Sequence, residues 1–305
     1  MKSINKHLPI RITRTPLLSV IVPCFQAETS LRRTINSIVQ QGWRQDDLEI
    51  VLSVDDGRDY GWAAKIWPQT TICTNLSLGT GPGPARNRGI LAASGKYLAF
   101  LDADDAWQLG YLDALMPVVA RHGLAFGMTE VRSSHGDQVL VLGQGQRQLR
   151  LQDFGHWPGS FQPVMRRSDS PLFINQPAQD VFHAMVVLAA YGKAAPLMDK
   201  ARYLLYLNAT SVTTSHGFSQ RIDRSYRQML SALKTWPALP AYQQHQMKKA
   251  LTMRLHWNRR YLAANDRHQD RISFYAFLAE TLALKKNYKN NAPDSLIKAK
   301  KENIF

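Results

Sequence analysis

The sequence predicts an α/β fold built on a mainly parallel, doubly wound sheet, and two patterns carry this prediction. Residues 17–23 (LLSVIVP) form an almost unbroken apolar run of strand length, as expected for a strand covered on both faces. Strand and helix patterns then alternate along the first hundred residues, which is typical of β-α-β units. With 305 residues and 45% hydrophobic content, the chain can bury the core of one large domain.

Each element of the first half has a local signal. After the first strand, TSLRRTINSIVQQG repeats apolar residues at helical spacing, with Thr29 or Ser30 as N-cap and Gly42 as the stop. Two prolines open a later helix, which Gly95 ends. We therefore expect a second strand at 48–54, a weaker third strand at 70–74, a helix at 82–93 and a fourth strand at 96–101.

The second half has a looser pattern. A strand pair is expected at 124–131 and 138–142, around the turn SSHGD, and a buried helix at 179–191. From residue 219 onward the sequence is helical, with an interruption at 236–240 (WPALP). Residues 285–305 have the composition of a frayed tail.

The charge is unevenly distributed and divides the chain into three regions. Residues 1–15 hold four Lys and Arg and no acid, residues 16–219 hold 17 of each sign, and residues 220–305 hold 17 Lys and Arg against six Asp and Glu. We expect a basic N-terminal arm, an α/β domain and a helical basic C-terminal region. A nucleic-acid binder would carry its charge on the folded module, so no nucleic acid is expected. The basic end suggests an anionic surface, such as a membrane face.

The expected location is the cytoplasm, with peripheral association at the inner face of the membrane. Cys24 and Cys73 are too few for a disulfide framework, and their neighbours lack zinc-site spacing. The sequence has no apolar run of about 18 residues, which a membrane span needs. The basic N-terminus lacks the apolar stretch of a signal peptide.

Acidic residues gather where the strands end, which is where ligands bind open α/β sheets. Asp55 and Asp56 follow the second strand, and the sequence DADD at 102–105 follows the fourth. Like charges this close repel unless a cation joins them, and hard oxygen ligands suit Mg²⁺ or Mn²⁺. Alternatively, DADD caps a helix beginning near Trp107, with its carboxylates solvated.

Four ordered blocks resemble the family 2 glycosyltransferases with the GT-A fold, over about residues 17–213. They are SVIVPCFQAE, EIVLSVDDG, GPGPARNRGILAASGKYLAFLDADD and QDVFHAMVVLAAYGKAAPLMDKARYLLYLNATSVT. The resemblance implies a GT-A-like catalytic domain at 16–219. It implies transfer of a sugar from a nucleotide diphosphate, UDP by analogy, to a glycan or lipid-linked acceptor, with inversion, in polysaccharide or glycoconjugate assembly.

The resemblance also implies roles for single residues around the nucleotide. Phe25 would pack on the base, although ordinary core packing is an alternative. Glu28 and Asp56 would accept hydrogen bonds from base or ribose, while Asp55 could be a turn residue. Arg88 is expected at the surface. The full set expected at the nucleotide is Pro23, Phe25, Glu28, Asp56, Arg86, Asn87 and Asp102, with Arg86 and Asn87 meeting the diphosphate.

For the metal and the chemistry, the resemblance points to the DADD segment and the helix at 179–191. Asp104 would coordinate Mn²⁺ or Mg²⁺ directly, and Asp102 would touch the metal or the ribose. Asp105 would orient the site or contact the acceptor. Asp180 would be the general base, unless it is only a charge favoured at a helix N-terminus. Gln179 replaces the family's usual Glu and would contact the acceptor or orient the site.

Two departures from the family pattern affect the metal and processivity. Where many relatives have a metal-binding His, this chain has Asn208, and His216 lies eight residues on, either as a substitute or as a solvated side chain. The third metal ligand is therefore open. Processive synthases carry QxxRW, whereas the nearest string, QPVMRR at 162–167, lacks the Trp. We expect one sugar to be transferred per encounter.

Two rival functions stay open at this point. A nucleotidyltransferase would show a Gly-rich loop with Lys after the first strand, and CFQAETS contains neither. The other rival is a catalytically inert protein that binds anionic surfaces through its basic end. In that region Met247, Leu251 and Leu255 share one helix face beside basic residues, so the face either docks on a membrane or packs on the catalytic domain.

Overall fold

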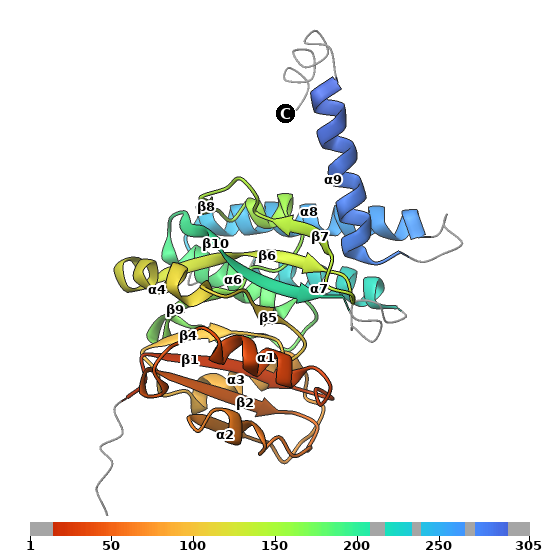
Figure 1. Ribbon diagram of the computed structural model, residues 1–305. Helices are drawn as coiled ribbons and strands as arrows, with labels where there is room; N and C mark the ends of the chain where they lie inside the picture. Colours follow the sequence, from red (N-terminus) through yellow and green to blue (C-terminus); the bar gives the residue numbers. More distant parts are fainter. Residues whose placement is uncertain (1–14, 208–216, 234–238, 266–271, 292–305) are drawn as a thin grey trace, which may run out of the picture.

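The computed structural model describes residues 15–207, 217–233, 239–265 and 272–291. Asn208, His216 and most of the 236–240 interruption lie outside these residues. Figure 1 shows the first strands at the lower end of the molecule and α8 and α9 at the upper end. The strands are β1 Leu18–Cys24, β2 Leu48–Val54, β3 Thr70–Cys73, β4 Tyr97–Phe100, β5 Ala106–Trp107, β6 Leu124–Arg132, β7 Gln138–Leu142, β8 Gln148–Leu149, β9 Pro163–Arg166 and β10 Ala195–Tyr206.

The helices follow the expected order. Helix α6 has the predicted bounds, and the second-half strand pair is present as the antiparallel β6 and β7. The α-helices are α1 Leu31–Val39, α2 Ala63–Ile66, α3 Pro82–Ala92, α4 Tyr111–His122, α5 Asp153–His156, α6 Gln179–Tyr191, α7 Phe218–Ala232, α8 Ala241–Asn265 and α9 Phe274–Asn291. Because α9 continues to Asn291, the expectation of a frayed tail from 285 was wrong for its first seven residues.

The sheet has a parallel block and a mixed block. Its order is β3-β2-β1-β4-β9-β6-β10-β5, and the pairs from β3 to β4 are all parallel. Strand β9 then runs antiparallel between β4 and β6, and β6 pairs in parallel with β10. The α/β class is confirmed, and the antiparallel insertion of β9 is what the sequence pattern did not indicate.

The burial of β1 and β2 shows that these strands form the centre of the N-terminal core. Every residue of β2 is buried, and in β1 only Pro23 is partly exposed. A strand buried on both faces needs helices on both sides, and separate apolar clusters lie on the two faces of the sheet. One of these clusters also contains residues of α7, α8 and α9, so the apolar core continues into the C-terminal helices.

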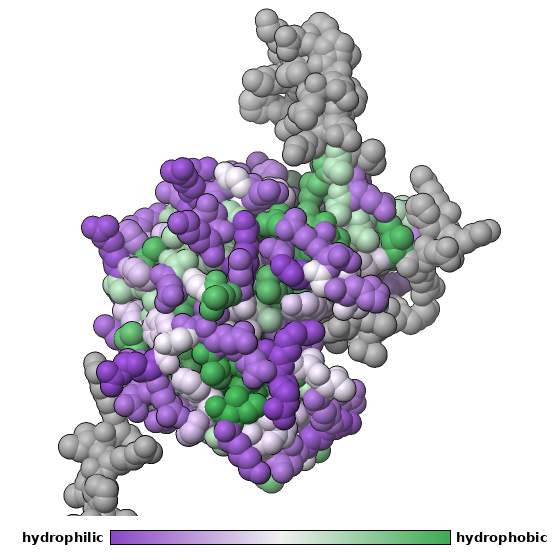
Figure 2. Space-filling model, viewed as in Figure 1, coloured by the Kyte–Doolittle hydropathy of each residue, from purple (hydrophilic) through white to green (hydrophobic). Residues whose placement is uncertain are grey.

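The surface in view is largely hydrophilic. Figure 2 shows apolar patches mainly in the lower half of the molecule and at the foot of α9. None of the described helices is long and apolar enough to cross a bilayer.

Candidate active site

Three loops after parallel strands meet at one edge of the sheet. Strand β1 pairs in parallel with β2 and β4, so the carboxyl ends of all three lie at this edge. The loops 25–28, 55–57 and 102–105 begin there, as the sequence predicts. The backbone N–H of Gln26 donates to the Asp56 carboxylate and joins the first two loops.

Asp56 is enclosed by protein donors. It accepts hydrogen bonds from the Tyr60 hydroxyl at 2.9 Å and the Arg58 N–H at 3.1 Å, and its side chain is 5% exposed. The Arg58 guanidinium forms an ion pair with Glu28. Phe25 is 55% exposed, which rules out the core-packing alternative. Phe25 and Glu28 thus lie at the open rim, while Asp56 holds the loop beneath them.

Asp55 organises the turn before α3. Its buried carboxylate accepts hydrogen bonds from the Thr80 hydroxyl at 2.6 Å and the Gly81 N–H at 2.8 Å. Arg88 pairs with the same carboxylate at 2.7 Å and is mostly buried. The expectation of a solvated Arg88 was therefore wrong, because this arginine neutralises a buried acid.

Arg86 is a fully buried cation at the centre of the site. It pairs with Asp102, its guanidinium lies 5.4 Å from the centre of the Phe173 ring, and its Nε and Nη1 have no hydrogen-bond partner. Burial alone would lower the pKa of Arg86, but the Asp102 and Asp180 carboxylates more than offset this and raise it. Arg86 therefore keeps its charge, and its Nε and Nη1 groups are buried without a hydrogen-bond partner.

Asn87 does not have the role expected from the sequence. Its side-chain oxygen accepts the Phe173 N–H at 2.7 Å, and its side-chain nitrogen donates to the Phe173 carbonyl at 2.9 Å. Both polar atoms are thus engaged with the backbone of the segment before α6. We correct the diphosphate contact of Asn87 to a positioning role, which keeps Phe173 against Arg86.

The acidic segment after β4 contains carboxylates in different environments. Asp102 is 33% exposed beside Arg86, and Asp104 is half-buried. Asp105 is buried and accepts hydrogen bonds from the Tyr203 hydroxyl at 2.8 Å and the Tyr206 N–H at 2.9 Å. Burial, with the nearby charges of Asp104 and Asp102, raises the pKa of Asp105 well above its usual range. Asp105 thus links the segment to β10 through Tyr203 and Tyr206, which favours the orienting alternative.

The helix-capping alternative for DADD is also wrong. Residues 106–107 form β5, and the next helix begins only at Tyr111, with Gly110 at its N-cap position. The carboxylates at 102–105 are too early in the chain to cap it.

The carboxylates at this edge fit a cation whose coordination is completed by a substrate. Within the described ranges, no group of three or more His, Cys, Asp or Glu side chains is placed to hold a metal. Mg²⁺ sites commonly use one or two carboxylates together with substrate phosphates. Asp102 and Asp104 are the partly exposed carboxylates of this segment, and Asp102 is paired with the cation of Arg86.

Asp180 lies in the first turn of α6, across from α3. The preceding Ala178 has φ of +59°, a strained conformation for a residue with a Cβ. The Ser160 hydroxyl donates to the Asp180 carboxylate at 2.6 Å, and the Oε1 atom of buried Gln179 has no partner. Helix α3 approaches closely here, since a Cβ on Gly83 would lie 2.4 Å from the Ile174 carbonyl oxygen.

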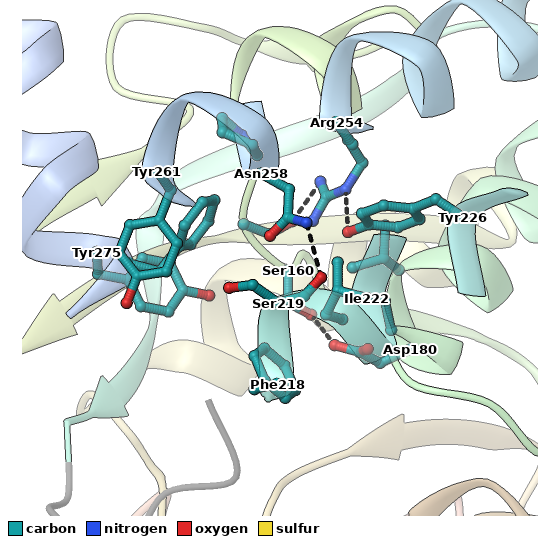
Figure 3. A pocket seen from close by; sticks show the side chains of 15 residues that line it. Ser160, Asp180, Phe218, Ser219, Ile222, Tyr226, Arg254, Asn258, Tyr261 and Tyr275 are labelled. Carbon is teal, nitrogen blue, oxygen red and sulfur yellow. Dashed lines mark hydrogen bonds between the residues drawn. The ribbon is translucent and has the colours of Figure 1, made fainter. Parts of the chain in front are cut away.

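A cavity of about 140 Å³ opens beside Asp180. Figure 3 shows Asp180 near Ile222 and Tyr226 of α7, with Tyr261 of α8 and Tyr275 of α9 at the opposite end. No pattern in the sequence indicated that the C-terminal helices would lie here. The wall residues from these helices include Phe218, Ile222, Tyr226, Arg254, Asn258, Tyr261 and Tyr275.

Arg254 ties α8 to the loop that carries Ser160. Its Nε donates to the Tyr226 hydroxyl at 2.8 Å, and its Nη1 donates to the carbonyls of Phe154 at 2.9 Å and Gly159 at 3.0 Å. Sequence reasoning did not single out this buried arginine as a site residue. One signal was present, because Arg254 falls three residues after Leu251, on the apolar face of the helix.

That apolar face of α8 is not available for docking. Met247, Leu251, Leu255 and Tyr261 are all buried, and α8 packs against α5, α6 and α7. The interpretation of this face as a membrane contact was wrong, and the packing alternative is confirmed.

His183 belongs to a stack behind the site. Its ring lies flat on Phe173, with centroids 3.8 Å apart, and its Nε2 lies 3.1 Å from the Pro171 carbonyl, so we assign the proton to Nε2. Burial, and to a lesser degree the charge of Arg86, lowers the pKa of His183 to about 3. The ring is therefore neutral and serves packing.

Sequence comparisons match the first half of the chain to a known family. A profile described as Glycosyl transferase family 2 matches residues 19–168. A putative teichuronic acid biosynthesis glycosyltransferase of Bacillus subtilis, TuaG, is 30% identical over 37% of this chain and 46% of its own length. A GalNAc(5)-diNAcBac-PP-undecaprenol beta-1,3-glucosyltransferase of Campylobacter jejuni is 36% identical over 33% of this chain and 34% of its own length. The chain spans less than half the length of these curated relatives.

Solved structures show the same fold at low identity. S. aureus TarS 1–349 in complex with UDP-GlcNAc has a TM-score of 0.65 and 15% identity, covering 80% of this chain and 74% of that chain. The mannosyltransferase PcManGT from Pyrobaculum calidifontis, in complex with GDP-Man and Mn²⁺, has a TM-score of 0.52 and 17% identity, covering 91% and 83%. The GT-A-like fold is thereby confirmed.

The His183 stack predicts how stability depends on pH. Because the folded pKa is about 3 and the unfolded value about 6.5, unfolding takes up a proton below pH 6.5. The free energy of unfolding should fall as pH decreases through this window, by up to about 1.4 kcal/mol per pH unit from this group. Urea unfolding between about pH 7.5 and pH 5 measures the slope.

The matched variants are His183→Phe, which keeps an uncharged ring in the stack, and His245→Phe on the exposed surface of α8. His183→Phe should flatten the slope and His245→Phe should not. Equal slopes in the wild type and His183→Phe would show that another group controls the acid response.

Proposed function

Residues 19–168 form a family 2 glycosyl transferase domain, and on that premise we propose that the chain is a glycosyltransferase of glycan biosynthesis. It transfers a sugar from a nucleotide diphosphate, UDP in the simplest case, to an acceptor hydroxyl with inversion. The observation that carries the proposal is the placement of Arg86, Asp102 and Asp104 at one sheet edge. Asp180 is near enough for its charge to raise the pKa of Arg86.

The donor nucleotide binds at the rim formed by the first two loops. Phe25 offers an exposed ring to the face of the base, and Glu28 offers carboxylate oxygens beside it. Pro23 and Asp56 shape this rim from below. Arg86 lies behind this rim, beside Asp102, and its positive charge would attract the diphosphate.

Asp104, with Asp102, holds a divalent cation, Mn²⁺ or Mg²⁺, together with the diphosphate. When bound, such a cation supplies positive charge to the leaving group. Asp102 has a second function, since its carboxylate also neutralises Arg86. Asp105, bonded to Tyr203, keeps the segment in position for both.

Asp180 removes the proton from the acceptor hydroxyl. The acceptor oxygen forms its bond to the anomeric carbon on one face while the bond to the diphosphate oxygen breaks on the opposite face, which inverts the configuration. The Ser160 hydrogen bond fixes the rotamer of Asp180 and leaves its other carboxylate oxygen for the proton. Protein side chains from several elements surround the group and limit access of water, which would otherwise hydrolyse the donor.

The acceptor is a growing glycan, carried on a lipid diphosphate. Relatives named for transfer to diphosphoundecaprenol-linked sugars support this class, among them the Campylobacter jejuni enzyme and Escherichia coli WfaP, whose name gives UDP-Glc as the donor. The 162–167 segment, which lacks the processive motif, lies in and beside β9, with Gln162 buried. One sugar is transferred per encounter.

The exposed stripe of α8 faces an anionic membrane that presents such an acceptor. Helix α8 contains no Asp or Glu. Lys248, Lys249, Arg259 and Arg260 are exposed, and their spacing places them on one side of the helix, opposite the buried face. Attraction here is electrostatic, because the apolar residues of the helix are already packed inward.

The metal assignment is tested with Asp104→Asn. UDP with Mn²⁺, at 100 times its dissociation constant, should stabilise the wild type by about 2.7 kcal/mol in thermal unfolding, and this gain should be lost in the variant. Asp199→Asn, which removes an exposed acid from β10, is the control and should keep the gain. If UDP with Mn²⁺ stabilises Asp104→Asn as much as the wild type, Asp104 is not a metal ligand.

The base assignment is tested with Asp180→Asn, which retains an oxygen for Ser160 but cannot take a proton. Turnover should fall about 10²- to 10⁴-fold, while the KM for the donor changes little. A raised donor KM with unchanged turnover would instead place Asp180 at the nucleotide.

The membrane proposal is tested by co-sedimentation with vesicles. Binding should require anionic lipid, weaken with salt, and drop when Lys248, Lys249, Arg259 and Arg260 become Gln, since each cation contributes about 1 kcal/mol. A second quadruple variant removes equal charge elsewhere, at Lys65, Arg121, Lys193 and Lys200, and should bind like the wild type. Equal binding by both quadruple variants would contradict a role for α8.

A further inference from the structure

Helix α1 binds the backbone of the acidic segment that follows β4. The Thr34 hydroxyl donates to the carbonyl of Ala103 at 2.9 Å and lies 2.7 Å from that of Asp105. Between these two, the carbonyl of Asp104 accepts a hydrogen bond from the guanidinium of Arg33. Two adjacent side chains of one helix therefore contact three consecutive carbonyls of the segment.

The same helix continues this contact beyond the acids. The Ser37 hydroxyl accepts the Trp107 N–H at 3.1 Å, and the Gln41 side-chain nitrogen donates to the Gln108 carbonyl at 3.1 Å. Like Thr34, Ser37 and Gln41 are buried, so their contacts belong to the packing of α1 on the sheet. Arg33 is the exposed member of this row. Its contact with the segment is therefore not a requirement of core packing.

A ring from another element holds the Arg33 side chain. The guanidinium of Arg33 lies 3.9 Å from the centre of the Tyr206 ring, at the last residue of β10. A guanidinium is attracted to the face of an aromatic ring, and its planar shape suits stacking there. Tyr206 also binds the segment through its backbone N–H, which donates to Asp105 at 2.9 Å. Contacts from α1 and β10 thus close around the backbone at Asp104 and Asp105.

The charge and the hydrogen bond of Arg33 would act on a bound cation in opposite directions. Arg86 pairs with Asp102 at one end of the segment, and Arg33 adds a second positive charge at the backbone of Asp104. This charge repels a nearby metal ion. The hydrogen bond favours metal binding, because it fixes the backbone that carries the Asp104 carboxylate. The sign of the change in metal affinity when Arg33 is removed therefore tells which effect dominates.

We propose that Arg33 is a positioning residue for the metal site and that the Tyr206 ring holds it in place. The inference rests on the proposed function, because it takes Asp104 as a metal ligand. Arg33 acts through the Asp104 carbonyl and touches neither the metal nor the sugar donor. Helix α1 and the end of β10 thereby set the direction of a carboxylate that belongs to neither of them.

The experiment removes each half of this contact. Arg33→Gln removes the planar cation, and Tyr206→Leu removes the ring while the backbone N–H still bonds to Asp105. In saturating UDP, the Mn²⁺ concentration that gives half of the maximal thermal stabilisation should rise about 10- to 100-fold in either variant. The double variant should show little further rise, because both substitutions remove one shared interaction. Hydrogen exchange of the metal-free protein should be faster at residues 103–107 in all three variants.

The matched control is Arg32→Gln. Arg32 is the neighbouring exposed arginine, and its guanidinium lies 4.8 Å from the centre of the Trp62 ring instead. This variant should match the wild type in both measurements, and thermal unfolding without ligand checks that every variant folds.

Three results would overturn the positioning role of Arg33. These are an unchanged Mn²⁺ requirement in Arg33→Gln, a lower requirement, which would mean that charge repulsion dominates, and unchanged hydrogen exchange at residues 103–107. A wild type that UDP and Mn²⁺ together do not stabilise would instead refute the proposed metal site. In that case the exchange measurement still decides whether Arg33 holds the segment.

Discussion

The buried charge of Arg86 is the constraint on which the site depends. A guanidinium withdrawn from water is costly unless opposite charge and hydrogen bonds replace the solvent. Here Asp102 compensates it directly, Asp180 acts from farther away, and the Phe173 ring covers it. These groups come from different elements. The sheet edge with Asp102 and the start of α6 with Asp180 are therefore linked through Arg86. Each carboxylate thus has a structural role in addition to the chemistry proposed for it.

The fold was largely predictable because its central elements have local signals. Strand β2 and helix α6 have the predicted bounds, since an apolar run and a buried helical segment are visible without knowing their neighbours. The acidic segment after β4 was likewise located from its place after a strand. The antiparallel strand β9 was missed, because its pairing with β4 and β6 joins segments far apart in the chain.

The sequence predicted which loops meet at the sheet edge, but it predicted the partners of single side chains less well. Asn87 was assigned to the diphosphate from its place at a helix start, and Arg88 was expected at the surface. Their partners are instead Phe173, 86 residues along the chain, and Asp55, 33 residues back. No local pattern contains that information. For the C-terminal helices, net charge describes only the exposed side of α8, whereas its buried side, with Arg254, lines a cavity.

The contacts of Arg254 also bear on how such proteins can be recombined. Its hydrogen bonds to the carbonyls of Phe154 and Gly159 mean that α5, the loop after it and helix α8 depend on one another for their polar partners. A chimera that imports foreign C-terminal helices onto this domain would leave those carbonyls without donors, or bury a guanidinium without acceptors. A chimera should therefore exchange two separate segments together: residues 154–160 and the C-terminal helices that they anchor.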